Sequence, residues 1–89
     1  MMVEREVKVA NRNGLHARPA AAIVKAASRF GSRITLKRDD LEVNGKSIMG
    51  VMMLAAEFGS TITIRAEGDD ATELVDAVAS LINNGFGES

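Results

Sequence analysis

The chain has 89 residues, which is enough for one modest hydrophobic core and excludes a two-domain enzyme. Hydrophobic residues make up 46% of the sequence and charged residues 26%, a balance that excludes an intrinsically disordered chain. Because cysteine is absent, a disulfide framework, a thiolate metal site and a thiol nucleophile are excluded as well. We therefore expect a single folded domain over residues 1–89.

No segment of the sequence has the pattern of a membrane span or a signal peptide. The longest uncharged run, residues 77–87, is shorter than the roughly 20 apolar residues that cross a bilayer. Charged side chains between positions 4 and 8 interrupt the place where a signal peptide would have its apolar segment. We therefore expect a cytoplasmic protein with no membrane partner.

Charge is unevenly distributed along the chain. Residues 1–38 carry nine Lys or Arg against two acidic residues, whereas residues 39–89 carry two basic residues against ten acidic ones. The first part is therefore suited to an acidic partner. Nucleic acid is not the expected partner, because Trp and Tyr are absent and the three Phe are not interleaved with the basic residues.

The chain begins with a strand pattern followed by a helix pattern. Residues 3–9 alternate between apolar and charged side chains, which predicts a strand with one solvated face. A turn cluster at residues 11–14 precedes a helix that carries Pro19 near its start and ends at Gly31. The apolar positions of this helix recur at steps of three and four and are Ala20, Ile23, Val24, Ala27 and Phe30.

The middle of the chain contains a predicted hairpin and a short helix. Residues 33–37 and 41–43 alternate on either side of a charged turn, which predicts two antiparallel strands. A helix then begins near Ser47 and is closed by Gly59. Its positions with core spacing are Val51, Leu54 and Ala55.

A fourth strand is predicted over residues 61–66, and the clearest helix of the chain follows it. Asp70 and Glu73 have the spacing of a capping box at the start of this helix. Its apolar stripe consists of Ala71, Leu74, Val75, Val78, Leu81 and Ile82. The order βαββαβα, with one polar face on every strand, predicts an α+β open-faced sandwich in which three helices cover one face of a four-stranded antiparallel sheet.

His16 is the single histidine, and it lies between the turn that ends at Gly14 and the helix that follows. This position places the imidazole beside the unpaired backbone N–H groups of Ala17 and Arg18, where the helix dipole favours an anion. Arg18 adds a fixed positive charge and a planar fork of donors that suits phosphate oxygens. Pro19 has no N–H, so it stiffens the helix start without competing for a ligand.

These residues suit a phosphoryl group carried on an imidazole nitrogen. A neutral imidazole acts as a nucleophile near neutral pH, and the adjacent amides and guanidinium would hold the phosphoryl oxygens. The residues leave one alternative open, in which His16 is only a helix cap at the surface. Both interpretations place His16 at the start of the helix.

Two segments of the chain resemble one protein family. Residues 14–20, Gly-Leu-His-Ala-Arg-Pro-Ala, are similar to the active-site segment of HPr, the histidine phosphocarriers of the bacterial phosphoenolpyruvate:sugar phosphotransferase system. Residues 44–52, Asn-Gly-Lys-Ser-Ile-Met-Gly-Val-Met, resemble the segment around the regulatory serine of that family. The two segments have the family's spacing, and the resemblance extends over essentially the full chain.

The resemblance implies a role for each matching residue. His16 would be the nucleophile, phosphorylated at Nδ1 by enzyme I and discharged onto IIA domains. Arg18 would compensate the charge of the phosphoryl group, and Ala17 would donate its backbone N–H. No cofactor and no metal is expected. The chain would act as a monomeric carrier rather than as a complete enzyme.

Ser47 is a candidate site of regulatory phosphorylation. It is predicted to be the N-cap of the short helix, where its oxygen accepts hydrogen bonds and the helix dipole tolerates a phosphate. The resemblance implies modification by HPr kinase/phosphorylase, and a plain helix cap is the alternative. A P-loop is excluded, because Asp40 stands where that motif requires a glycine five residues before Gly45.

The short helix has more apolar side chains than one core face uses. Those that point away from the core, close to Ser47, are Ile48, Met49 and Met52. Exposed methionines suit a surface that binds several partners, whereas core filling is the ordinary interpretation of a single Met. The resemblance implies that this surface contacts enzyme I, IIA domains and the kinase.

We therefore expect a phosphocarrier that accepts a phosphoryl group on His16 from enzyme I and passes it to IIA domains. Two alternatives stay open. One is a binding module of the same fold whose His16 is structural, and the other is a regulatory protein that acts mainly through phospho-Ser47, without sugar transport. Phosphoryl acceptance from phosphoenolpyruvate and enzyme I separates the carrier from the binding module.

Overall fold

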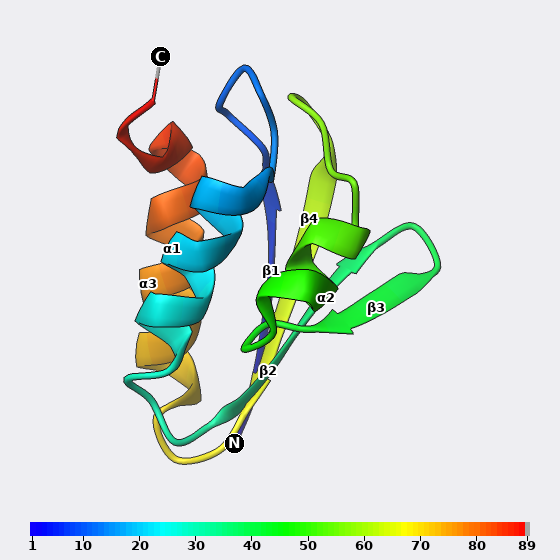
Figure 1. Ribbon diagram of the computed structural model, residues 1–89. Coiled ribbons are helices and arrows are strands. Elements are labelled where there is room, and N and C mark those ends of the chain that lie inside the picture. Colours follow the sequence, from blue (N-terminus) through cyan, green and yellow to red (C-terminus); the bar gives the residue numbers. More distant parts are fainter. Residues whose placement is uncertain (89) are drawn as a thin grey trace.

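A computed structural model describes residues 1–88 (Figure 1). The strands are β1 (Met2–Lys8), β2 (Arg33–Arg38), β3 (Leu41–Asn44) and β4 (Thr61–Glu67). The helices are α1 (Ala17–Ala27), α2 (Ile48–Met53) and α3 (Ala71–Asn83), and a 3₁₀ turn, η1 (Gly85–Gly87), follows α3. Within residues 1–88, no helix has the length and apolar character needed to cross a membrane.

The four strands form one sheet in the order β1-β4-β2-β3, and every neighbouring pair is antiparallel. Ala66 of β4 lies opposite Val3 of β1 on one side and Ile34 of β2 on the other, so the register places apolar residues in rows across the sheet. The α+β open-faced sandwich predicted from the sequence is confirmed.

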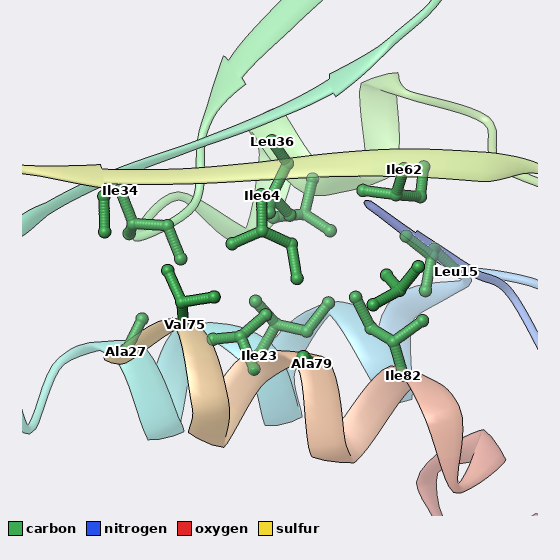
Figure 2. Close-up of a cluster of buried hydrophobic side chains, with 14 of the residues drawn as sticks. Leu15, Ile23, Ala27, Ile34, Leu36, Ile62, Ile64, Val75, Ala79 and Ile82 are labelled. Atoms are coloured by element: carbon green, nitrogen blue, oxygen red, sulfur yellow. The ribbon is translucent and has the colours of Figure 1, made fainter. Parts of the chain in front are cut away.

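The hydrophobic core lies between the inner face of the sheet and the helices (Figure 2). Ile62, Ile64 and Ala66 of β4 are buried, whereas the residues that alternate with them are exposed (Thr61, Arg65 and Glu67) or partly exposed (Thr63). Figure 2 shows side chains of α1 and α3 pointing at those of the sheet. The helical side chains in the core include Ile23, Leu74, Val75, Val78 and Ile82. The outer face of the sheet carries polar residues such as Glu4, Lys37 and Arg65.

Two helices end earlier than the sequence predicts. Helix α1 ends at Ala27 rather than at Gly31. After Ser28 the next two backbone N–H groups bond to carbonyls three residues earlier, as in a 3₁₀ turn, and Phe30 N donates to Ala27 O at 3.1 Å. Helix α2 ends at Met53 rather than at Gly59.

The prediction that Ala55 is a core residue is wrong. Ala55 lies past the end of α2 with φ of +48° and is exposed, and the next residue, Ala56, is buried instead. Arg38 of β2 fixes this turn, because its Nη1 donates to the carbonyl oxygens of Leu54 and Ala55 at 3.1 Å each. The side chain thus satisfies carbonyls that a six-residue helix leaves free.

The predicted capping box of α3 does not form. Asp70 is the N-cap residue but makes no side-chain cap bond within α3. Its carboxylate instead accepts hydrogen bonds from the Gly31 and Ser32 backbone N–H groups, each at 2.9 Å, and from the Ser32 hydroxyl. The bond from the Ser32 hydroxyl, followed by that from the Gly31 N–H, holds the pKa of Asp70 below its ordinary value. Asp70 therefore joins the start of α3 to the loop between α1 and β2.

Candidate functional site

The turn before α1 is fixed by two contacts. Asn11 is fully buried, and its Nδ2 donates to the carbonyl oxygen of Gly14 at 2.7 Å. Gly14 has φ of +70°, and a Cβ at this position would lie only 2.3 Å from the carbonyl oxygen of Ala56. That oxygen accepts a hydrogen bond from Leu15 N at 2.9 Å, and Leu15 is buried in the core. The turn is therefore fastened to the loop after α2, and His16 follows directly.

His16 lies at the N-cap position of α1, where the sequence places the helix start. Its backbone carbonyl accepts the first helical bond from Ala20 N at 3.0 Å, so the amides of Ala17 and Arg18 precede the first intrahelical bond. The imidazole makes no capping bond to the helix and is 41% exposed. His16 therefore occupies the N-cap position without a capping bond from its side chain.

Glu88 is a residue of this site that sequence analysis missed. Its Oε1 lies 3.4 Å from Nε2 of His16 and accepts a hydrogen bond from Asn11 Nδ2 at 3.1 Å. More than seventy positions separate Glu88 from His16 in the sequence, so no spacing rule connects them. The lone acidic residue after the glycines at positions 85 and 87 was the only signal in the sequence.

Glu88 carries its charge next to the imidazole. Partial burial opposes its ionisation, but the hydrogen bonds from Asn11 and His16 and the positive charge of Arg18 outweigh that effect, so the pKa of Glu88 lies below its ordinary value. Ala17 and Arg18 are both exposed beside it. The start of α1 therefore combines an imidazole, the amides of Ala17 and Arg18, a guanidinium and one carboxylate.

Ser47 lies at the N-cap of α2, as predicted. Its Oγ accepts a hydrogen bond from Gly50 N at 3.0 Å, and its carbonyl accepts one from Val51 N at 2.9 Å. The side chain of Asn44 supports the turn before it by accepting from Lys46 N at 2.8 Å. The Ser47 hydroxyl is partly exposed, so a capping bond and chemical access coexist at this residue.

Helix α2 presents an apolar surface to solvent. Ile48 is 45% exposed, Met49 75% and Met52 43%, in the outward orientation that the sequence predicts. The structure adds Met53, which is 63% exposed and lines the same shallow hollow with the other three. We call these four residues the methionine surface. Sequence analysis did not name Met53, although the helical period that places Val51 and Leu54 inward also directs Met53 outward.

The charged residues do not gather into a metal site. Among residues 1–88, no group of three or more His, Asp or Glu side chains is arranged to hold a metal ion. The start of α1 lies beside α2, which packs against α1.

Known proteins of one family match nearly the whole chain. The family described as "PTS HPr component phosphorylation site" matches residues 3–84. The phosphocarrier protein HPr of Treponema pallidum is 53% identical over 98% of this chain and 99% of its own length. The HPr-like protein Crh of Halalkalibacterium halodurans is 49% identical over 91% of this chain and 96% of its own.

Solved structures of relatives have the same fold. The crystal structure of an HPr from Thermoanaerobacter tengcongensis matches with a TM-score of 0.93 at 45% identity, covering 98% of both chains. A structure described as an HPr dimer from the same organism matches with a TM-score of 0.78 at 46% identity, covering 92% of this chain and 94% of that one.

Fold and site together define an open-faced sandwich protein with an exposed histidine at the start of its first helix. The chain belongs to the HPr family, the phosphocarrier components of the phosphotransferase system.

Proposed function

We propose that this chain accepts a phosphoryl group on His16 from enzyme I and passes it to IIA domains. The proposal depends on one observation. The imidazole of His16 is exposed at the start of α1, near the amides of Ala17 and Arg18, and makes no capping bond to the helix. Membership of the HPr family supports the same function and implies partners from the phosphotransferase system. The carrier enters and leaves the reaction as a covalent intermediate, and it works with its partners' catalytic residues.

The proposed transfer uses each residue at the helix start differently. The imidazole supplies the lone pair that attacks phosphorus, and the amides of Ala17 and Arg18 point at the oxygens of the bound group. The guanidinium of Arg18 compensates their negative charge. The methionine surface, whose helix packs against α1, docks the larger partners, since thioether side chains repack against different surfaces.

Incubation with phosphoenolpyruvate and enzyme I tests the proposal directly. The protein should gain the mass of one phosphoryl group, and acid should remove that group while alkali leaves it in place. The His16→Gln variant, which keeps a polar side chain at this position, should gain nothing. If the native protein stays unmodified, the carrier function is excluded and the alternative of a binding module with a structural His16 remains.

A second candidate is a mainly regulatory role through phosphorylation of Ser47 by HPr kinase/phosphorylase. The match to an HPr-like protein named Crh supports this candidate, as does the partly exposed hydroxyl at the start of α2. Treatment with the kinase and ATP should phosphorylate native protein and leave Ser47→Ala unmodified. If native protein is modified by the kinase but not by enzyme I, the regulatory role is the correct one.

We further propose that the transferring form is a cytoplasmic monomer. His16 and the methionine surface have to reach larger proteins, and a permanent dimer through this side of the molecule would cover them. Sedimentation at micromolar concentration should give the mass of one chain. A dimer that persists on dilution and on addition of enzyme I would contradict this proposal.

A further inference from the structure

The carboxylate of Glu88 sits against one particular nitrogen of the His16 ring. We propose that Glu88 is a positioning residue for phosphoryl transfer, which keeps the ring proton on Nε2 of His16 and thereby presents the lone pair of Nδ1 to the incoming phosphoryl group. This inference rests on the proposed function, in which His16 is the acceptor.

The hydrogen-bond pattern sets which ring nitrogen carries the proton. An ionised carboxylate only accepts hydrogen bonds, so the contact of 3.4 Å between Glu88 Oε1 and His16 Nε2 is a hydrogen bond only in the tautomer that carries its hydrogen on Nε2, and the carboxylate favours that tautomer. A neutral imidazole has a single N–H, so Nδ1 is then the nitrogen with the free lone pair. The resemblance to HPr proteins implied Nδ1 as the modified atom, and the contact with Glu88 gives a physical reason for it.

Asn11 holds the carboxylate in place. It is fully buried, and the two bonds of its Nδ2, to Gly14 O at 2.7 Å and to Glu88 Oε1 at 3.1 Å, fix the direction of the amide. The segment that carries Glu88 is also constrained, because Gly85 packs on Asn11 with φ of +61° and Glu88 N donates to Gly85 O at 2.9 Å. Buried Asn11 and the turn at Gly85 therefore both constrain the position of the Glu88 carboxylate.

The attraction between the Glu88 carboxylate and the His16 ring becomes stronger as the reaction proceeds. The Nδ1 lone pair forms the new N–P bond while the N–P bond of the phosphorylated donor breaks, and the donor nitrogen keeps the electron pair of that bond. The proton stays on Nε2, so the His16 ring gains a positive charge that faces the carboxylate. Because this attraction is stronger after the bond forms than before, it stabilises the transition state relative to the free carrier.

The phosphoryl group does not displace the carboxylate. The two nitrogens of an imidazole ring point away from each other, so a group on Nδ1 lies on the side opposite the Nε2–H. Arg18, two residues after His16, already acts on Glu88 through its charge. The site thus holds one permanent carboxylate and receives one transient phosphoryl group.

The single histidine makes the test direct, because an imidazole nitrogen spectrum contains only the signals of His16. We would record ¹H–¹⁵N correlations at about pH 9, where an imidazole is neutral, for native protein, Glu88→Gln and Glu88→Ala. The exposed Glu73→Gln on α3 is the control for loss of one carboxylate. Rates of phosphorylation by enzyme I would be measured on the same four proteins.

The native ring should be almost wholly the Nε2–H tautomer. In both Glu88 variants the Nδ1–H fraction should rise about twofold to fivefold, and phosphorylation at saturating enzyme I should slow about threefold to tenfold with little change in KM. Glu73→Gln should match native protein in both respects. An unchanged tautomer ratio or an unchanged rate in Glu88→Gln would overturn the role of Glu88. Failure of the native protein to accept phosphate would instead overturn the proposed function, whatever the tautomer ratio.

Discussion

At the scale of single residues, the candidate functional residues differ from the residues that stabilise the fold around them. His16, Ala17 and Arg18 are exposed at the start of α1, whereas the residues that hold this start in place, Asn11 and Leu15, are buried. Substitutions of the exposed group remove few packing contacts, so their effects on transfer and on stability should be separable.

Removal of the imidazole should abolish function and spare the fold. We expect His16→Ala to accept no phosphoryl group, because no other histidine is present, while its free energy of unfolding stays within about 0.5 kcal/mol of native protein. Mass spectrometry after incubation with enzyme I, together with urea unfolding, measures both quantities. A folded His16→Ala protein that still becomes phosphorylated would place the acceptor elsewhere.

Removal of the guanidinium should slow transfer without stopping it. Arg18→Ala should lower the rate of phosphoryl transfer about tenfold, because the guanidinium no longer offsets the negative charge of the phosphoryl group in the transition state. Thermal unfolding should scarcely change, since Arg18 is exposed. Quenched-flow kinetics with enzyme I and a IIA domain test the prediction, and the exposed Arg29→Ala is the control for loss of one positive charge. Equal rates in the Arg18 and Arg29 variants would contradict it.

At the scale of elements, the turn before α1 depends on its glycine. Gly14→Ala should lower the free energy of unfolding by about 2–4 kcal/mol, because its Cβ would collide with the Ala56 carbonyl at a positive φ. Gly59→Ala is the matched control, since Gly59 also has positive φ, +85°, but open space around it. That variant should lose only about 1 kcal/mol. Equal losses in urea unfolding would mean that the contact with Ala56 is unimportant.

The start of α3 should make stability depend on acid pH. Because the pKa of Asp70 lies below the ordinary value of 3.8, its ionised form stabilises the native state fully above that value, and the contribution is lost as pH falls further. Asp70→Asn should therefore unfold at lower temperature than native protein at pH 7. The difference should shrink as pH falls below about 4. Asp69→Asn is the control for loss of charge at the adjacent exposed residue, and a gap independent of pH would contradict the prediction.

Sequence patterns predicted all four strands and three helices, because each buries one face and its apolar residues follow the period of that element. They failed where distant segments meet. Asp70 follows the capping-box pattern, yet the loop at Ser32 supplies stronger donors. Ala55 follows the helical period, yet Arg38 ends the helix before it. Glu88 reaches His16 through the fold alone, so only the structure assigns it to the site.

At the scale of the whole molecule, a charge beside the methionine surface should weaken binding more than folding. Ser47→Asp should reduce affinity for enzyme I about tenfold at low salt, because a carboxylate at the start of the helix that carries Ile48, Met49 and Met52 must lose its water in the complex. In the free protein the same carboxylate stays solvated at a favourable helix start. The acidic partner that the basic residues 1–38 suggest would repel it further.

Calorimetric titration of enzyme I at two salt concentrations measures this effect. The loss of affinity should decline as salt rises, because screening weakens the repulsion. Thr72→Asp is the control, since it adds the same charge to the first turn of α3 at an exposed position away from the methionine surface. Equal affinities of native and Ser47→Asp protein at low salt would place α2 outside the interface.

The two ends of the described chain lie at opposite ends of α3 (Figure 1). The carbonyl of Met1 accepts a hydrogen bond from Gly68 just before this helix, whereas Glu88 follows the helix and touches His16. The 13 residues of α3 span about 20 Å. An affinity tag or a surface anchor at residue 1 therefore leaves His16 accessible to large proteins, whereas the same attachment after residue 88 would crowd the carboxylate next to the imidazole.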